Sequence, residues 1–412
     1  MNFKQKSLRL GAGLLTVGLL AGACGGNAAE DSASDAVNSD GSGQSDDGGE
    51  SKGGDYGKAY TEVRAAYHHM FETAGVLSGA IAKQNGFAEE ENKAADTRVA
   101  LTRLLGEHAL LSANATGKGL AGAPDFGAAA EALDENSVEL AKVIGSVYGM
   151  DAENEFLKQW RDHIRMFVDY TTATAKDDSA GQEKARAELS GYEKNFGAFL
   201  GGAVGLPGEA VQEALTAHVD QLIAAIDATK AGDFDAAYGK VREAYHHMGV
   251  TAAVLSEAIA KQQGLGDSAT KSAETRSLLG AQLGEHAVLS SLATSKGLTA
   301  APDFEAIAKA LDGNSVELAG TIGSVYGKEA ENEFLKQWRD HIRMFVDYTT
   351  ATAKQDTAGQ EKAVAELGGY VKNFGAFLAG AVGLPAEAVQ DAIKMHVGQL
   401  KGAVDAFAAA AA

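Results

Sequence analysis

The sequence predicts an all-α protein built from two tandem up-and-down helical bundles. Apolar residues recur at intervals of three and four, for example at Tyr60, Val63, Tyr67 and Met70, which is the spacing of one face of a helix. Alternation typical of strands is nearly absent. In addition, the chain repeats itself with a constant offset of 178 residues, and a unit of that length is a domain rather than a solenoid repeat.

The repeat is clearest in the string "AENEFLKQWRDHIRMFVDYTTATAK", which occupies residues 152–176 and again residues 330–354. We expect about six helices in each repeat. Prolines and glycines divide the first repeat into expected helices at 57–84, 94–118, 135–147, 151–177, 181–203 and 208–229, with the second set offset by 178. The segment 124–133 is expected to be a short turn.

The N-terminal part of the chain is expected to lie outside the bundles. Residues 1–23 combine a basic start with a short apolar run that ends in "LAGAC", which is typical of a lipoprotein signal peptide with Cys24 as the lipidated residue. An ordinary secretory peptide is the alternative. Residues 24–53 are rich in Gly, Ser and Asp and are expected to form a flexible acidic tether. Bundle repeats then follow at 54–231 and 232–412, on an extracytoplasmic protein anchored to the cell membrane.

Charge and composition exclude several classes of function. The formal net charge of −20 argues against nucleic acid, whose phosphates require basic surfaces. Cys24 is the only cysteine, so the sequence predicts no disulfide and no thiolate site within the fold. We find no nucleophile–base arrangement typical of a hydrolase and therefore predict that the protein is not an enzyme.

All ten histidines fall in the repeats, five in each copy. The first helix of each repeat carries two adjacent histidines, which point about 100° apart on a helix. The residues one turn away from His69 are the same around His247, whereas those around His68 differ from those around His246. A packed face tolerates fewer changes than a solvated one, so we expect His69 and His247 to point inward and the other two outward.

Four helices of each repeat should therefore place a histidine near their midpoint, facing the core. Helices of similar length that pack side by side bring their midpoints to one level. The sequence predicts a layer of four imidazoles in each repeat: His69, His108, His163 and His218, and then His247, His286, His341 and His396. Buried imidazoles require partners. The layer therefore either binds a ligand or is a purely structural polar layer whose members satisfy one another with waters.

Imidazole ligands suit a copper or zinc ion. Four methionines lie near the histidines in the sequence, and their thioethers favour copper. These possible additional ligands are Met70, Met166, Met248 and Met344. A non-covalent haem between two histidines is the alternative cofactor, since bundle cores accommodate haem. A carboxylate-bridged di-iron site is not supported, because the Glu-x-x-His spacing at Glu243–His246 has Ala65 in the corresponding position of the first repeat.

Both copies resemble a histidine-bearing helical repeat of secreted bacterial proteins. The residues that carry the resemblance are "WRDHIRMFVDYTTATA", "NFGAFL", "HVDQLIAAIDA" and "HHMGVTAAVLSEAIAKQ". Some of those proteins also carry a segment similar to the N-terminal domain of copper amine oxidases, and no such segment is recognisable here. The His-Met pair of the repeat corresponds to His69-Met70 and His247-Met248. The resemblance implies no firm activity.

The sequence as a whole predicts a membrane-anchored lipoprotein whose two histidine-rich bundles bind a metal ion or haem without catalysing a reaction. The rival interpretation is a structural or interaction module of the cell envelope, in which the buried histidines only specify the core. Its protein partners are not predicted by any motif.

Overall fold

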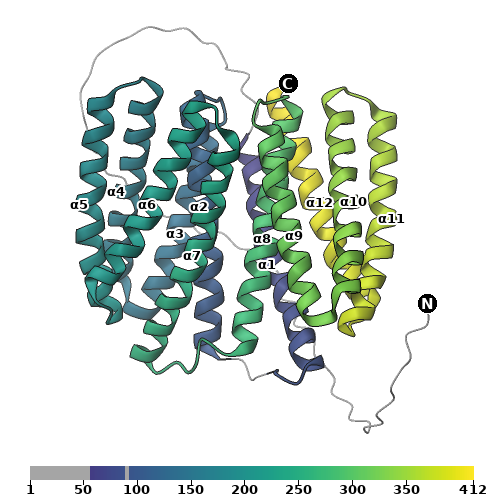
Figure 1. The fold of residues 1–412 in the computed structure, drawn as a ribbon, viewed down its shortest axis with the longest axis horizontal. Coiled ribbons are helices and arrows are strands. Elements are labelled where there is room, and N and C mark those ends of the chain that lie inside the picture. The colour runs from purple at the N-terminus through teal and green to yellow at the C-terminus, as the bar shows by residue number, and fades with distance from the viewer. Residues whose placement is uncertain (1–55, 89–91) are drawn as a thin grey trace, which may run out of the picture. The chain divides into compact units, whose positions relative to one another are not determined.

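A computed structural model describes residues 56–88 and 92–412 of the chain. The described residues form twelve helices and no strand, which confirms the all-α prediction. The helices run side by side as an up-and-down array (Figure 1). The predicted signal peptide, Cys24 and the tether lie outside the described residues.

The six helices of the first repeat match the six of the second. Their bounds are α1 Tyr56–Gln84, α2 Lys93–Ala121, α3 Phe126–Tyr148, α4 Met150–Ala175, α5 Ser179–Val204, α6 Gly208–Ala231, α7 Phe234–Gln263, α8 Lys271–Leu298, α9 Phe304–Tyr326, α10 Lys328–Ala353, α11 Thr357–Val382 and α12 Ala386–Ala411. No helix among the described residues is long and apolar enough to cross a membrane.

One boundary differs from the sequence prediction, because α3 begins at Phe126 and takes in most of the segment 124–133 that we expected to be a turn. The segment contains strong helix formers and buries Ala129, Ala132 and Leu133 at helical spacing. Asp125 precedes the helix and receives a hydrogen bond from Tyr60 at 3.1 Å. Pro124 therefore lies at the end of the connection between α2 and α3, and the residues that follow it are helical.

The packing of the helices crosses the repeat boundary. Helix α7 packs on α2 and α6 of the first repeat, whereas α1 packs on α8 and α12 of the second repeat. We call α2–α7 the first bundle and α8–α12 together with α1 the second bundle. The two groups are visible in Figure 1, where α1 lies among the helices of the second repeat. This arrangement corrects the expectation that each repeat packs by itself: the first helix of each repeat is exchanged.

Loop length gives a physical reason for the exchange. Helix α6 ends at Ala231 and α7 begins at Phe234, so only two residues connect them. Gly232 caps α6 with a left-handed φ of 76°, and Asp233 accepts a hydrogen bond from the backbone N–H of Ala236. Such a short connection makes α6 and α7 antiparallel neighbours. Helix α1 packs on α12, in the place that corresponds to that of α7 beside α6.

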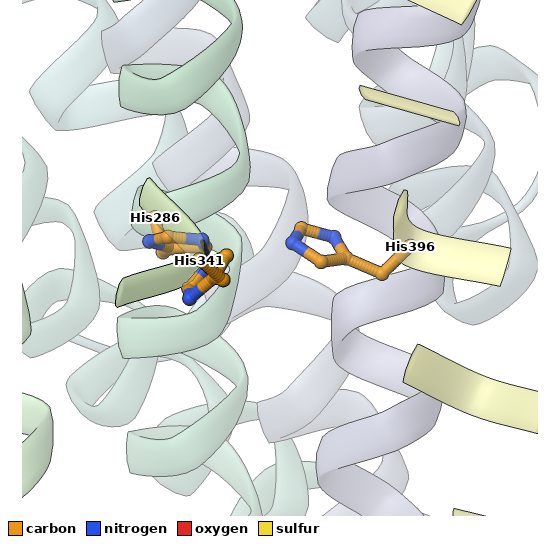
Figure 2. A group of neighbouring side chains, drawn as sticks. All are labelled: His286, His341 and His396. Carbon is orange, nitrogen blue, oxygen red and sulfur yellow. Dashed lines mark hydrogen bonds between the residues drawn. The ribbon is translucent and has the colours of Figure 1, made fainter. Parts of the chain in front are cut away.

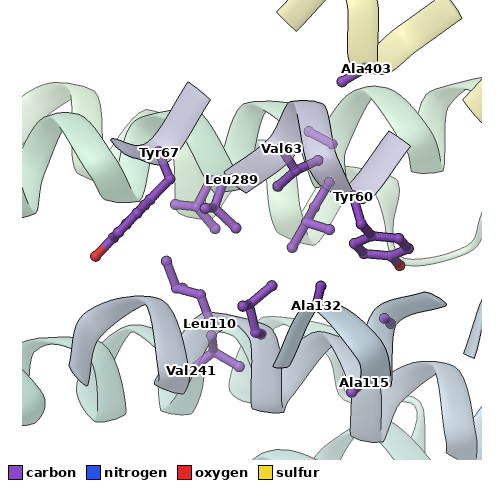
Figure 3. Close-up of a cluster of buried hydrophobic side chains, with 14 of the residues drawn as sticks. Tyr60, Val63, Tyr67, Leu110, Ala115, Ala132, Val241, Leu289 and Ala403 are labelled. Atoms are coloured by element: carbon purple, nitrogen blue, oxygen red, sulfur yellow. The ribbon is translucent and has the colours of Figure 1, made fainter. Parts of the chain in front are cut away.

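A shared apolar core joins the two bundles. It draws side chains from α1, α2, α7 and α8, including Tyr67, Leu110, Val241 and Leu289 (Figure 3). The tyrosines of the exchanged helices cross glycines on α2 and α8: a Cβ at Gly106 would lie 2.7 Å from the Tyr245 ring. A Cβ at Gly284 would lie equally close to Tyr67, at 2.7 Å. Glycine at these positions allows the tyrosines to pack directly on the backbone.

Candidate metal centre

Each bundle contains one layer of four histidines, each from a different helix. In the first bundle these are His108, His163, His218 and His247, and in the second bundle they are His69, His286, His341 and His396. The predicted number of histidines per layer is therefore correct. The assignment of His69 to the layer of its own repeat is wrong, as is that of His247, because α1 and α7 are exchanged.

The second bundle brings three of its histidines together. His286, His341 and His396 each offer a ring nitrogen, and these nitrogens all lie within 4.8 Å of one another. The Nε2 atoms of His286 and His341 are 3.3 Å apart. Figure 2 shows the ring of His396, on α12, pointing toward this pair. The three rings thus converge on one point from α8, α10 and α12.

The first bundle repeats this arrangement more loosely. The Nε2 atoms of His108 and His163 are 3.4 Å apart. The ring centre of His218 lies 5.7 Å from that of His108, compared with 5.4 Å for the corresponding pair His286 and His396. The nitrogens of the three rings do not form a group within 4.8 Å, unlike those of the second bundle. The two layers are therefore similar but not equivalent.

The converging histidines are buried and neutral. Burial and the neighbouring imidazoles lower the pKa of His108, His286 and His341 well below the usual value. Burial is also the main cause that lowers the pKa of His218 and of His396 to about 3. The pKa of His163 is likewise lowered to about 3, mainly by burial and also by the neighbouring imidazole of His218. Neutral imidazole is the form that binds a metal ion.

His396 and its counterpart His218 lack hydrogen-bond partners. Neither ring nitrogen of either residue contacts a donor or acceptor, and both residues are 4% exposed. Burying a polar group without a partner costs free energy. A cavity of about 50 Å³ adjoins His396 and is lined also by Trp338, Tyr370 and Met70. The layer therefore has unused nitrogen lone pairs beside a small space.

The fourth histidine of each layer is directed elsewhere. The Nε2–H group of His69 donates to the carbonyl oxygen of Ala392 at 2.9 Å, and that of His247 donates to Ala214 at the same distance. His69 is buried, whereas His247 is half-buried. Their inward orientation confirms the sequence prediction. Each fourth histidine joins an exchanged helix to the last helix of a repeat: His69 joins α1 to α12, and His247 joins α7 to α6.

The outward histidines belong to a polar cluster that the sequence did not predict. The fully buried carboxylate of Glu107 receives hydrogen bonds from Arg64 at 3.0 Å and from Asn136 at 2.8 Å, and it lies 3.1 Å from Nε2 of His68. Burial raises the pKa of Glu107, but His68 and Arg64 together bring it below the usual value. The Glu-His pair kept in both repeats was the available signal for this buried carboxylate.

The corresponding cluster in the second repeat is more open. Arg242 donates to Glu285 at 2.9 Å and Asn314 donates to it at 2.8 Å. His246 is 48% exposed in its side chain, and its Nε2 lies 3.6 Å from Glu285. Each cluster groups a histidine with two carboxylates, as a metal site does. However, an arginine is paired with both carboxylates of each cluster, Arg64 in the first and Arg242 in the second, and its positive charge opposes a cation.

The predicted methionines differ in position. Met70 and Met248 are buried, whereas Met166 and Met344 are only partly buried. Met70 lines the small cavity beside His396, and it reaches that place only because α1 belongs to the second bundle. This small cavity gives haem no support, since a site for a ligand of that size requires several hundred Å³ and the cavity has about 50 Å³.

No known protein family, characterised protein or solved structure that we compared with the chain matches it. The resemblance to the histidine-bearing repeat of secreted bacterial proteins stays a prediction. The interpretation of the histidine layers therefore depends on their geometry, their burial and their protonation.

Proposed function

We propose that the protein binds a transition-metal ion in the second bundle, through His286, His341 and His396. The observation that carries the proposal is that three buried, neutral imidazoles each direct one nitrogen toward a common point. These three nitrogens all lie within 4.8 Å of one another. Two of these nitrogens are 3.3 Å apart. Metal–nitrogen bonds of 2.0–2.1 Å in a tetrahedral site place neighbouring nitrogens about 3.3 Å apart.

Zinc and copper(I) suit this set of ligands. Three imidazoles form a common zinc site, and a thioether beside them favours copper(I). Met70 supplies a thioether at the cavity next to His396. We infer that the ion is held or passed on and not used in catalysis, because the cavity beside His396 is lined mainly by apolar side chains and by no carboxylate or lysine. The predicted lipid anchor at Cys24 would keep this activity at the cell membrane.

A structural polar layer is the competing proposal, and it also has support. One neutral imidazole can donate to another, so that the Nε2 atoms of His286 and His341 form an N–H···N hydrogen bond at 3.3 Å. Such a layer would specify the packing of the helices without a ligand. It leaves both nitrogens of His396 unpaired, which is why we favour an ion.

Titration of the metal-free full chain with zinc and with copper(I), followed by calorimetry, tests the proposal. We expect one tightly bound equivalent in the second bundle and a weaker one in the looser first bundle. Metal binding should raise the thermal midpoint by mass action. His396→Gln should remove the tight equivalent, and the matched His218→Gln should leave it.

The pH dependence of binding provides a second measurement. Protons compete with a metal for free histidine near pH 6.5, whereas the pKa of His396 is lowered to about 3 in the fold. We therefore expect affinity to stay nearly constant from pH 7.5 to pH 6. Absence of saturable binding of either ion to the folded chain would establish the structural role instead.

A further inference from the structure

A pocket of about 590 Å³ opens between α8, α9 and α10 and reaches the histidine layer of the second bundle. His341 and Ser290 are among its lining residues, and the hydroxyl of Ser290 is 3.5 Å from Nε2 of His286. Val346, 39% exposed, also lines it. The pocket therefore extends from the protein surface to the histidines.

The first bundle has a counterpart between α2, α3 and α4, with about 300 Å³. The two pockets use equivalent positions of the two repeats, such as Ser112 and Ser290 or Phe126 and Phe304. A hollow that recurs at equivalent positions is a feature of the repeat and not an isolated packing defect. The larger one has the volume of a small-molecule site, for which 300–1,000 Å³ is usual.

The walls of the larger pocket are mainly apolar. Phe304, Leu311, Ile342 and Phe345 line it, and an apolar ligand would gain free energy by covering them. Apolar walls with a few polar groups are typical of sites for small organic molecules. The chain therefore favours a ligand with an apolar body.

Thr349 lines this pocket and has an unused hydrogen-bonding group. The residue is 3% exposed and its buried hydroxyl has no partner. The corresponding hydroxyl of Thr171, in the first bundle, donates to the carbonyl oxygen of Phe167 at 2.8 Å. A buried hydroxyl without a partner is costly, so a ligand that hydrogen-bonds to Thr349 would remove that cost.

Charges in the lining select against an anion. Arg339 forms hydrogen bonds of 2.6 and 2.8 Å to Asp312 and is therefore already neutralised. Glu305 also lines the pocket, and no salt bridge to it is found among the described residues. The lining thus carries one net negative charge, and a carboxylate or phosphate ligand would meet repulsion.

We propose that this pocket binds an uncharged amphiphile, an apolar chain or ring system with one hydroxyl group, whose hydroxyl bonds to Thr349. The pocket shares His341 with the proposed metal centre, and its other lining residues are not metal ligands. It goes beyond the metal-binding proposal and does not depend on it, because its walls and its free hydroxyl are present without an ion. If the protein bound both a metal ion and the amphiphile, the apolar molecule would lie beside the metal centre.

Calorimetric titration of the metal-free full chain with 1-decanol tests the proposal, with decanoate at pH 8 as the charged comparison. We expect one saturable equivalent of decanol and an affinity for decanoate at least about tenfold lower, since its charge is not matched in the pocket. Ala308→Trp should fill the pocket from α9 and abolish binding. The matched Ala130→Trp, in the first bundle, should leave it unchanged.

A second variant keeps the test independent of any folding defect in Ala308→Trp. Thr349→Val preserves shape and removes the hydroxyl, so decanol affinity should fall about threefold to tenfold, the value of one hydrogen bond. Zinc titration of each variant shows whether the metal centre persists. Absence of saturable decanol binding, equal affinity for decanoate, or loss of binding through Ala130→Trp alone would each overturn the proposal.

Discussion

Burial of imidazole without a charged partner determines the protonation of the histidine layers. Desolvation disfavours the charged ring, and neighbouring imidazoles add repulsion once one of them is protonated. The pKa values of His163, His218 and His396 are lowered to about 3. His246 shows the opposite behaviour, because the carboxylate of Glu285, 3.6 Å from its Nε2 atom, raises its pKa. Environment and not residue type therefore separates the inner from the outer histidines.

The inner histidines predict acid sensitivity of the metal-free protein. Between pH 6.5 and about pH 3 the unfolded chain binds protons that the folded chain excludes, so the free energy of unfolding falls as pH is lowered through this window. Each such histidine contributes up to about 1.4 kcal/mol per pH unit. Urea denaturation at pH 7, 6, 5 and 4 measures this slope.

His218→Leu should make that slope shallower by the contribution of one group. His246→Gln is the matched control: its raised pKa acts above pH 6.5 and in the opposite direction, since the stability it adds is lost as pH rises. His246→Gln should therefore not reduce the slope of the free energy of unfolding below pH 6.5 as much as His218→Leu does. An unchanged slope in His218→Leu would mean that the ring is already charged in the folded protein.

A short loop and close helix contacts at glycines together position the histidine layers. The two-residue connection of α6 to α7 brings His247 beside α6. The glycines of α2 and α8 allow the exchanged helices to approach closely, because Tyr67 and Tyr245 pack where a Cβ would otherwise lie. The hydroxyl of Tyr67 also donates to the carbonyl oxygen of Arg103 at 2.7 Å. These close contacts of α1 and α7 with α8 and α2 thus fix the position of His69 and His247 along the bundle axis.

Gly106→Ala should destabilise the protein by about 1–3 kcal/mol, the usual cost of overpacking, since the new methyl group would lie 2.7 Å from Tyr245 and 2.9 Å from the hydroxyl of Tyr67. Gly117, on the same helix, has no atom within 4 Å of an added Cβ. Gly117→Ala should instead stabilise the helix by up to about 1 kcal/mol. Chemical denaturation of both variants checks the difference, and equal effects would contradict the packing argument.

The described part of the molecule consists of two bundles whose boundary does not coincide with the repeat boundary. The first bundle is continuous in sequence from α2 to α7, whereas the second needs α1 from the start of the chain. The ion pair of Arg64 with Glu107 links α1 back to α2, with an Nε–Oε1 distance of 3.0 Å. Contacts between the bundles are therefore both apolar and ionic.

Two fragments of similar length should behave differently. Fragment 93–263 contains the complete first bundle and should fold as a helical monomer with a cooperative thermal transition. Fragment 54–231 follows the sequence repeat, leaves the place of α7 empty and gives α1 no second bundle to join. Two copies should exchange α1 and form a dimer. Light scattering and circular dichroism distinguish the cases, and a folded monomer of 54–231 would contradict the exchange.

Local pattern was sufficient for the helices and for the inner histidines. The spacing of apolar residues predicted twelve helices, and the unchanged neighbours of His69 and His247 were enough to identify both as inward. The turn expected at 124–133 was wrong because Pro124 only ends the preceding connection, and the helix formers after it decide the segment. The polar cluster at Glu107 was missed because Arg64 and Asn136 are distant in sequence.

The sequence by itself determined the helices, the repeat and which face of each helix carries a histidine, because these depend on periodicity within a few turns. Only the tertiary structure decided which four histidines share a layer. The two copies have nearly the same apolar faces, so α1 could pack on the helices of either repeat with similar local contacts. The short connection from α6 to α7 resolves this choice, since it commits α7 to the first bundle and leaves the place beside α12 for α1.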